Sequence, residues 1–356
     1  MKTRLRCLIR RHLFLILFAG FIPLAAFPQE SGSCAEKLQT AQTLFDRGQV
    51  EQVADLLSEC MKSGFNREES LAAYKLIIQT YLFEDRLSEA DSAMLYFLNR
   101  NPEYQLSPTD HSSFVHLFNT FLVKPIVQIS LHLGTNLPFM TFVVYRSATG
   151  YPSEGEYSTP AVNFYGSLEA KMKMSEKLEM NLEIGYSQLA FTNTEDFLGT
   201  GTTTYKETQN RIEIPVSATY NIKSPGKLTP YGRLGLGPAL TRNSGANARF
   251  DPSDINGTPR KPSDIDRKDS RIFLDIFGQI GAGIKYKTRG GYMFAEARSN
   301  FGIFNQVLRE SLPSDNHSSD ELSNTYYYVD DDFNLNAANF TLGYTQIFYK
   351  TSKRKE

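Results

Sequence analysis

Apolar and polar residues alternate along residues 211–222, which read RIEIPVSATYNI. The even positions are apolar or aromatic from Ile212 to Ile222, whereas the odd positions include the charged residues Arg211 and Glu213. A period of two residues indicates a β-strand with one apolar face and one polar face. Because the polar face carries full charges, the pattern is typical of a strand that separates lipid from a polar interior.

Seven further segments show the same alternation: residues 126–134, 161–174, 180–191, 231–240, 271–286, 292–301 and 339–349. About ten residues in a tilted strand suffice to cross a bilayer. Short turns alternate with long polar connections at residues 137–160, 192–209, 241–270 and 302–333. The pattern predicts an eight-stranded antiparallel transmembrane β-barrel at residues 125–350, with the long loops outside the cell. A soluble β-sandwich uses the same period and is the alternative fold.

The polar faces of these strands predict a charged barrel interior. An eight-stranded barrel is just wide enough for side chains to fill it, so inward charges should pair with one another. Five acidic and five basic residues have the required phase: Glu169, Lys171, Glu183, Arg211, Glu213, Arg233, Asp275, Lys285, Glu296 and Arg298. Glycines on the same faces, such as Gly283 and Gly343, should leave room for them, and His132 should point inward and form a hydrogen bond.

Before the strands, at residues 33–104, the apolar period becomes helical, with Val50, Val53 and Leu57 on one face. The motif FDRGQVEQV, which begins at Phe45, is matched about 37 residues later by LFEDRLSEA. This spacing is close to that of tetratricopeptide repeats, and the second unit resembles that family. Asp85 stands where the repeat has a glycine in its turn. We therefore expect an α + β chain of two domains, a repeat-like helical module followed by the barrel.

Two cysteines lie in the helical module. Cys34 is at the start of the first predicted helix and Cys60 is near the end of the second, so an antiparallel helix pair would bring them together. An exported protein forms disulfides readily, and we predict a Cys34–Cys60 bridge. Two buried free thiols are the alternative.

The chain ends carry targeting and connecting signals. Residues 1–28 have a basic, an apolar and a polar part, which indicates a secretory signal peptide. A single membrane anchor is the alternative, although the apolar run is short. Residues 105–124 are predicted to form a linker and a junction helix capped by Asp110 or Ser112 and ended by Lys124–Pro125. Residues 351–356 form a basic tail that we expect to fray.

Composition adds little specific chemistry. The net charge of −1 gives no bias toward nucleic acid, and the chain has no Trp but 19 Tyr and 25 Phe. Tyr326–Tyr328 are candidate interfacial anchors at a strand base. A rim-site enzyme would depend on His317 and the carboxylates at 330–332, but such loop charges are usually solvated. Asp254, Asn256 and Gly257 suggest a calcium loop that lacks the required ligands at both ends. We expect no metal, cofactor or enzymatic activity.

Several strands resemble a known family. The stretches RIEIPVSATYNI, PYGRLGLGPAL, YMFAEARSNFG and FTLGYTQIFY are similar to the PorT-like outer-membrane β-barrel proteins of Bacteroidota. The Glu-Ile-Pro and Glu-x-Arg strands carry most of the likeness. The resemblance implies an outer-membrane location, and some members of this broad group act in type IX secretion and gliding. It supplies no catalytic residues.

These patterns together favour a non-enzymatic outer-membrane protein. Its expected partners are outer-membrane lipid and periplasmic or envelope proteins bound by the helical module, as in a scaffold or accessory subunit of an envelope complex. A surface protein that binds ligands through its long extracellular loops is the alternative function.

Overall fold

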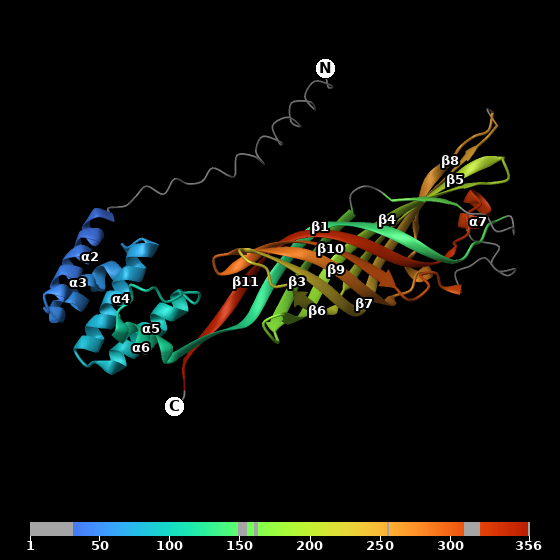
Figure 1. The fold of residues 1–356 in the computed structure, drawn as a ribbon. Coiled ribbons are helices and arrows are strands. Elements are labelled where there is room, and N and C mark those ends of the chain that lie inside the picture. The colour runs from blue at the N-terminus through green and yellow to red at the C-terminus, as the bar shows by residue number, and fades with distance from the viewer. Residues whose placement is uncertain (1–30, 149–154, 160–162, 255, 310–320, 355–356) are drawn as a thin grey trace, which may run out of the picture. The chain divides into compact units, whose positions relative to one another are not determined.

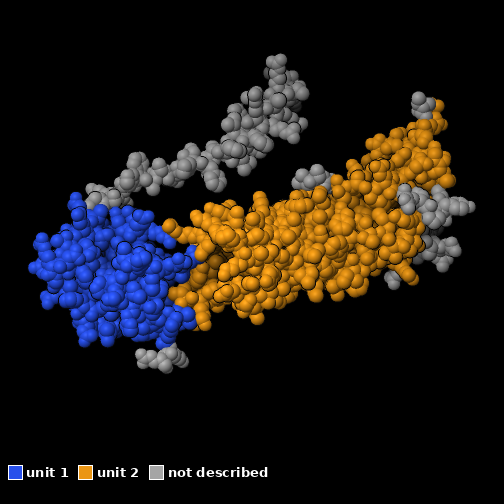
Figure 2. Space-filling view, in the orientation of Figure 1, with its two compact units in different colours: residues 1–122, 351–356 blue, residues 123–350 orange. Residues whose placement is uncertain are grey.

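A computed structural model describes residues 31–148, 155–159, 163–254, 256–309 and 321–354. The predicted signal peptide lies outside these residues. The chain divides into two compact units, one formed by residues 1–122 with 351–356 and the other by residues 123–350 (Figure 2).

The first unit is helical (Figure 1). Its elements are α2 (Ser31–Asp46), η2 (Val50–Gln52), α3 (Val53–Lys62), α4 (Arg67–Phe83), α5 (Leu87–Arg100) and α6 (Ser112–Asn119). Its core includes Ala41, Val53, Leu57, Ala73 and Leu76, as the helical period predicts. None of the described helices is long and apolar enough to cross a membrane.

Capping residues and residues with positive φ mark the ends of these helices. Asn66 and Glu69 form a reciprocal capping box at the start of α4, which satisfies two otherwise unpaired backbone N–H groups. Gly48 and Asp85 follow α2 and α4 with φ of 76° and 56°. Asp85 thus adopts the left-handed conformation that the glycine of the repeat would favour.

The predicted disulfide is present. Cys34 in α2 and Cys60 in α3 are bonded, with their Cα atoms 5.7 Å apart. The bridge joins the start of α2 to the end of α3, so these two helices run in opposite directions.

The junction differs from its prediction at both ends. His111, rather than Asp110 or Ser112, occupies the N-cap position of α6, and its side chain accepts a hydrogen bond from the Ser113 N–H. The helix ends at Asn119, and β1 already begins at Phe121. Pro125 lies inside this strand but before Gln128, where pairing with β3 begins, so its missing N–H breaks no bond of that ladder.

The expectation of a frayed tail was wrong for residues 351–354, which are bonded in the structure, whereas the last two residues lie outside the described part of the chain. Strand β11 continues through Lys353, whose ammonium contacts the Asp91 carboxylate of α5. The Arg354 N–H donates to the Thr120 carbonyl oxygen over 2.7 Å. These bonds attach the last residues to the helical unit.

The second unit is an antiparallel β-barrel of about eight strands (Figure 1). Its strands are β1 (Phe121–Val144), β3 (Asn163–Lys173), β4 (Leu178–Asp196), β5 (Gly201–Glu213), β6 (Val216–Asn221), β7 (Leu228–Pro252), β9 (Leu274–Thr288), β10 (Gly291–Gly302) and β11 (Asp332–Lys353). β5 and β6 are two parts of one barrel strand, which is interrupted at residues 214–215. Neighbours follow the order β4-β3-β1-β11-β10-β9-β7-β5, and β5 also pairs with β4.

Several strands run far beyond ten residues, which corrects the predicted loops. β7 has 25 residues and pairs with β5 as far as Gly201↔Pro252, so most of 192–209 and 241–252 is strand. The short strands β2 (Glu156–Ser158) and β8 (Arg260–Asp266) extend this sheet beside β4 and β7. Outside the apolar band the outward face meets polar surroundings, whereas inward residues such as Tyr205 and Phe250 pack in an apolar cluster, so the contrast with lipid no longer marks the strand. β-branched residues such as Thr202–Thr204 still favour an extended backbone.

Alternation within the apolar band separates two surfaces. Leu234 on β7 is 68 % exposed, whereas the neighbouring Arg233 is 3 % exposed. The outward face is therefore apolar and the interior polar, as the opening segment predicts for Ile212 against Arg211 and Glu213.

Candidate functional site

The ten predicted interior charges are all buried inside the barrel unit. Arg233 of β7 lies at the centre of the largest group. Its guanidinium donates to Glu169 over 2.5 Å and to Glu296 over 3.0 Å. Glu169 also accepts from Lys171 Nζ and lies 2.9 Å from His132 Nε2. Strands β1, β3, β7 and β10 thus all contribute to one ionic cluster.

A second pair lies next to this cluster. The Arg298 guanidinium donates to both carboxylate oxygens of Glu183, over 2.7 and 2.9 Å. Tyr165 donates its hydroxyl to the same carboxylate over 2.7 Å, and its ring lies under the guanidinium at 5.0 Å. A bidentate pair with a further donor is among the stronger polar arrangements in proteins.

Inward glycines make room for the large side chains. A Cβ at Gly283 would lie 2.5 Å from the Tyr231 ring, and a Cβ at Gly343 would lie 2.2 Å from the Phe294 ring. Tyr231 in turn donates to Glu296 over 2.7 Å. The glycines therefore allow aromatic side chains to reach into the interior and to bond the charges there.

The remaining interior charges have fewer close partners of opposite charge. Lys285 donates to Glu179 over 2.7 Å. Arg211 bonds the amides of Gln209 and Gln306, and its nearest carboxylate, that of Asp275, is 3.9 Å away. In the part of the chain that the structure describes, Glu213 has no ion pair within 4.0 Å and accepts from Asn300 Nδ2 over 3.1 Å. Side-chain amides thus replace some of the expected opposite charges.

A further ionic cluster lies in the extension of the strands and was missed by the sequence reasoning. Arg271 is 2 % exposed and donates twice to Glu207, over 2.8 and 2.6 Å, and twice to Asp330, over 2.9 and 2.7 Å. Arg267 also contacts the Asp330 carboxylate. Glu207 continues the odd-numbered phase of Arg211 and Glu213, so extending the alternation by four residues would have found it.

An aromatic cluster surrounds this arginine. The Tyr205 and Tyr328 rings stack at 4.0 Å, and Phe333 lies 5.8 Å from the Arg271 guanidinium carbon. Tyr326 and Tyr328 are buried there, which corrects their prediction as interfacial anchors. Tyr326 ends the short helix α7 (Glu321–Tyr326), and Tyr328 lies between α7 and β11; both pack against the ends of other strands. Alternation within a single strand cannot predict this packing between distant segments.

The carboxylates proposed for a rim-site enzyme are held in structural bonds. Asp331 accepts from the Arg146 backbone N–H over 2.6 Å and from the Tyr157 hydroxyl over 2.9 Å. Asp332 accepts from the Arg146 guanidinium over 2.6 Å. His317 lies outside the described residues, and among those described no three His, Cys, Asp or Glu side chains form a potential metal site.

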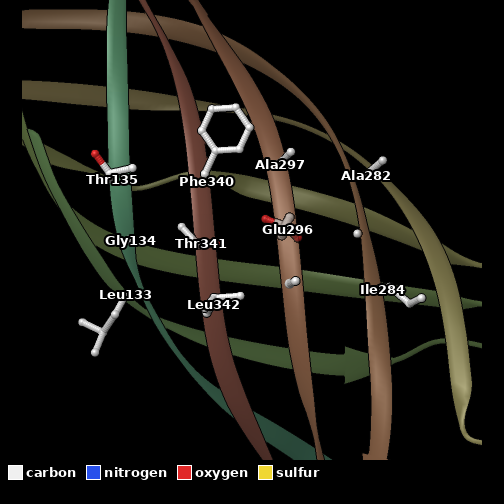
Figure 3. Close-up of a pocket in the computed structure, with 12 residues that line it drawn as sticks. Leu133, Gly134, Thr135, Ala282, Ile284, Glu296, Ala297, Phe340, Thr341 and Leu342 are labelled. Carbon is white, nitrogen blue, oxygen red and sulfur yellow. The ribbon is translucent and has the colours of Figure 1, made fainter. Parts of the chain in front are cut away.

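An apolar hollow of about 810 Å³ lies on the outward face of β1, β11, β10 and β9 (Figure 3). Leu133, Phe340, Leu342 and Ile284 line it, and small residues such as Ala297 form its base. It opens on the apolar band rather than into the interior. Most of its lining is apolar, so it offers few polar groups that could bind a solute.

One family model and several solved structures match this chain. Residues 126–307 match the family of the outer membrane protein beta-barrel domain. Neisserial surface protein A is similar in structure, with 15% identity and a TM-score of 0.28 over 64% of this chain and 97% of that one. OprG of Pseudomonas aeruginosa matches with 9% identity and a TM-score of 0.31 over 65% and 98%.

The outer membrane protease OmpT of Escherichia coli matches with 11% identity and a TM-score of 0.29 over 62% of this chain and 96% of that one. No curated protein matches the sequence. Likeness at this level says nothing about activity. The family match covers more than half of the chain and agrees with the observed strands, so this protein belongs to the outer membrane β-barrel domain family and is located in the outer membrane.

Proposed function

We propose that the protein is a non-enzymatic scaffold or accessory subunit of an envelope complex. In this proposal the barrel is a closed membrane anchor, and the helical unit, a tetratricopeptide-like module in the periplasm, binds other envelope proteins. The observation that carries the proposal is the combination of a charge-filled barrel with a separate compact helical unit.

The filled interior argues against a pore. The clusters around Arg233 and Arg298 join strands on several sides of the barrel through side-chain bonds of 2.5–3.0 Å. Moving an ion past them would require breaking buried ion pairs, which is strongly unfavourable.

The helical unit offers an apolar contact surface. Phe83 at the end of α4 and Leu87 at the start of α5 are 68 % and 59 % exposed. Tyr96, further along α5, is also exposed and stacks on Tyr74 at 5.0 Å. Exposed aromatic and apolar side chains of this kind are typical anchors of protein interfaces. The resemblance to PorT-like proteins suggests secretion or gliding components as partners.

The proposal is tested by cross-linking in cells that express the full chain. A Phe83→Ser/Leu87→Ser variant should lose its cross-linked partner while the barrel still inserts. Leu198 is 69 % exposed in the other unit, so Leu198→Ser is a matched control that should retain the partner. Equal cross-linking by both variants would contradict the proposed contact surface.

A second candidate function is ligand binding at the extracellular end. The strand extension around β5, β7 and β8 favours it, because it forms an ordered polar surface where irregular loops were expected.

A further inference from the structure

The outward face of β5 and β7 changes from apolar to polar at a defined level. Ile212 and Leu240 pair across these strands as the last apolar outward residues of this face. The next outward pair is Asn210 and Asn243, with Arg242 exposed in the bulge before Asn243. The Tyr186 hydroxyl donates to Asn210 Oδ1 over 2.8 Å. An amphipathic tyrosine bonded to the first polar position is typical of the edge of the hydrocarbon layer.

A polar groove of about 690 Å³ lies directly beyond this edge, on the outward faces of β5, β7 and β8. We call it the β5–β7–β8 groove. Its lining includes Lys206, Asn210, Asn243, Asn247 and Lys268. At about 3.3 Å per strand residue and a strand tilt of about 45°, Asn210 to Lys206 lie roughly 5–14 Å beyond Ile212 along the bilayer normal. This is the level of lipid headgroups and their first sugars, on the long-extension side that faces outside in this class of barrel.

Some polar side chains in and near the groove already have an ion pair or hydrogen bond, and others have none to any described residue. Arg249, nearby on β7, is paired with Asp251 at 2.7 Å, and Asn247 donates to Asp264 over 3.0 Å. Within the described residues, the side-chain ammonium groups of Lys206 and Lys268 have no ion pair or hydrogen bond. Two free cations beside amides and carboxylates match a ligand that carries both anionic groups and hydroxyls.

The floor of the groove is open. Gly245 of β7 lies in its lining, and a Cβ added there would meet no atom within 4 Å. A larger residue could therefore be accommodated at this position without disturbing the strand, and it would occupy the space that a ligand needs.

We propose that the β5–β7–β8 groove binds the phosphorylated sugar headgroup of a glycolipid in the outer leaflet. The amides and carboxylates would bond sugar hydroxyls, and Lys206 and Lys268 would contact phosphate. A membrane glycolipid fits better than a soluble glycan because the groove is continuous with the lipid-facing surface at Ile212 and Leu240. The inference does not depend on the scaffold role.

The test uses the full chain in phosphatidylcholine nanodiscs with or without a lipopolysaccharide that carries only phosphorylated inner-core sugars. Glycolipid retained per protein is counted by native mass spectrometry. Gly245→Tyr should weaken retention at least about tenfold, equivalent to about 1.4 kcal/mol. Gly232 lies on the same strand near its other end and also has no atom within 4 Å of an added Cβ, so Gly232→Tyr is the matched control and should bind as the native protein does.

A Lys206→Gln/Lys268→Gln variant tests the charge contribution even if Gly245→Tyr fails to fold. It should retain less glycolipid, and salt should weaken the binding of the native protein but not of this variant. Equal retention by Gly245→Tyr and Gly232→Tyr would overturn the proposal. It would also be overturned if the free inner-core oligosaccharide bound as tightly as the embedded glycolipid.

Discussion

Replacing Arg271 by Met should strongly destabilise the end of the barrel where the strands extend beyond the apolar band. The variant leaves Glu207 and Asp330 buried without the guanidinium that donates four hydrogen bonds to them at 2.6–2.9 Å. Removing one partner of a buried ion pair typically costs 3–5 kcal/mol, because the remaining charge is uncompensated. Met retains most of the apolar volume, and Arg267 still pairs with Asp330, so we expect a loss near the lower end of this range, about 3 kcal/mol in the free energy of unfolding.

The measurement is urea unfolding of the full chain in detergent micelles, followed by circular dichroism because the protein has no Trp. Arg249→Met is the matched control, since Arg249 forms a 2.7 Å pair with Asp251 but is exposed on the same extension. Exposed pairs contribute about 0–1 kcal/mol. A triple variant, Arg271→Met/Glu207→Gln/Asp330→Asn, removes the stranded charges and should recover part of the lost stability.

The reasoning would be refuted if Arg271→Met and Arg249→Met differed by less than about 0.5 kcal/mol, the usual range for surface substitutions. It would also be refuted if the triple variant were less stable than Arg271→Met alone, because neutral amides would then be worse than unpaired carboxylates.

Three further predictions concern other parts of the chain. Gly343→Leu should prevent barrel assembly, because its Cβ would lie 2.2 Å from both the Phe294 ring and the Leu131 carbonyl oxygen. The measurement is loss of the heat-modifiable band on a gel. The control Gly278→Leu, which has open space at its Cβ, should assemble. Cys34→Ser/Cys60→Ser should lower the stability of the helical unit by about 3 kcal/mol in urea unfolding, and an unchanged midpoint would argue against a stabilising bridge. Burial alone would raise the pKa of the Asp110 carboxyl, but hydrogen bonds from Lys75, Tyr104 and Ser107 bring it below its usual 3.8. The Asp110 contribution to stability should therefore be complete above about pH 4 and be lost as the pH falls through the lowered pKa; Asp110→Asn should abolish this acid dependence, and an identical acid profile in both proteins would show that the carboxyl makes no such contribution.

The sequence predicts the barrel well because alternation reports a physical boundary. Arg211 and Glu213 could be assigned to the interior from their phase alone, since a one-residue shift would expose them to lipid. The same signal fails where lipid ends. Along Thr202–Thr208 the outward residues are polar and the inward ones alternate between Thr203, Tyr205 and Glu207, so the strand was taken for a loop and Glu207 was overlooked.

Contacts between distant segments were the least predictable. Arg271 lies outside any regular strand, and its partners come from β5 and from the residue 330 region, 64 and 59 positions away. Tyr328 is a plausible interfacial residue by composition, but α7 and β11 place it against Tyr205 instead. The disulfide was predictable because an antiparallel helix pair fixes which helix ends meet.

The central claim is that side chains fill the interior of the barrel. Single-channel recording of the full chain in planar bilayers tests it most directly, with a known porin as the positive control. The account predicts no steady conductance, because the clusters around Arg233 and Arg298 occupy the interior. A reproducible open level from the native protein would contradict it.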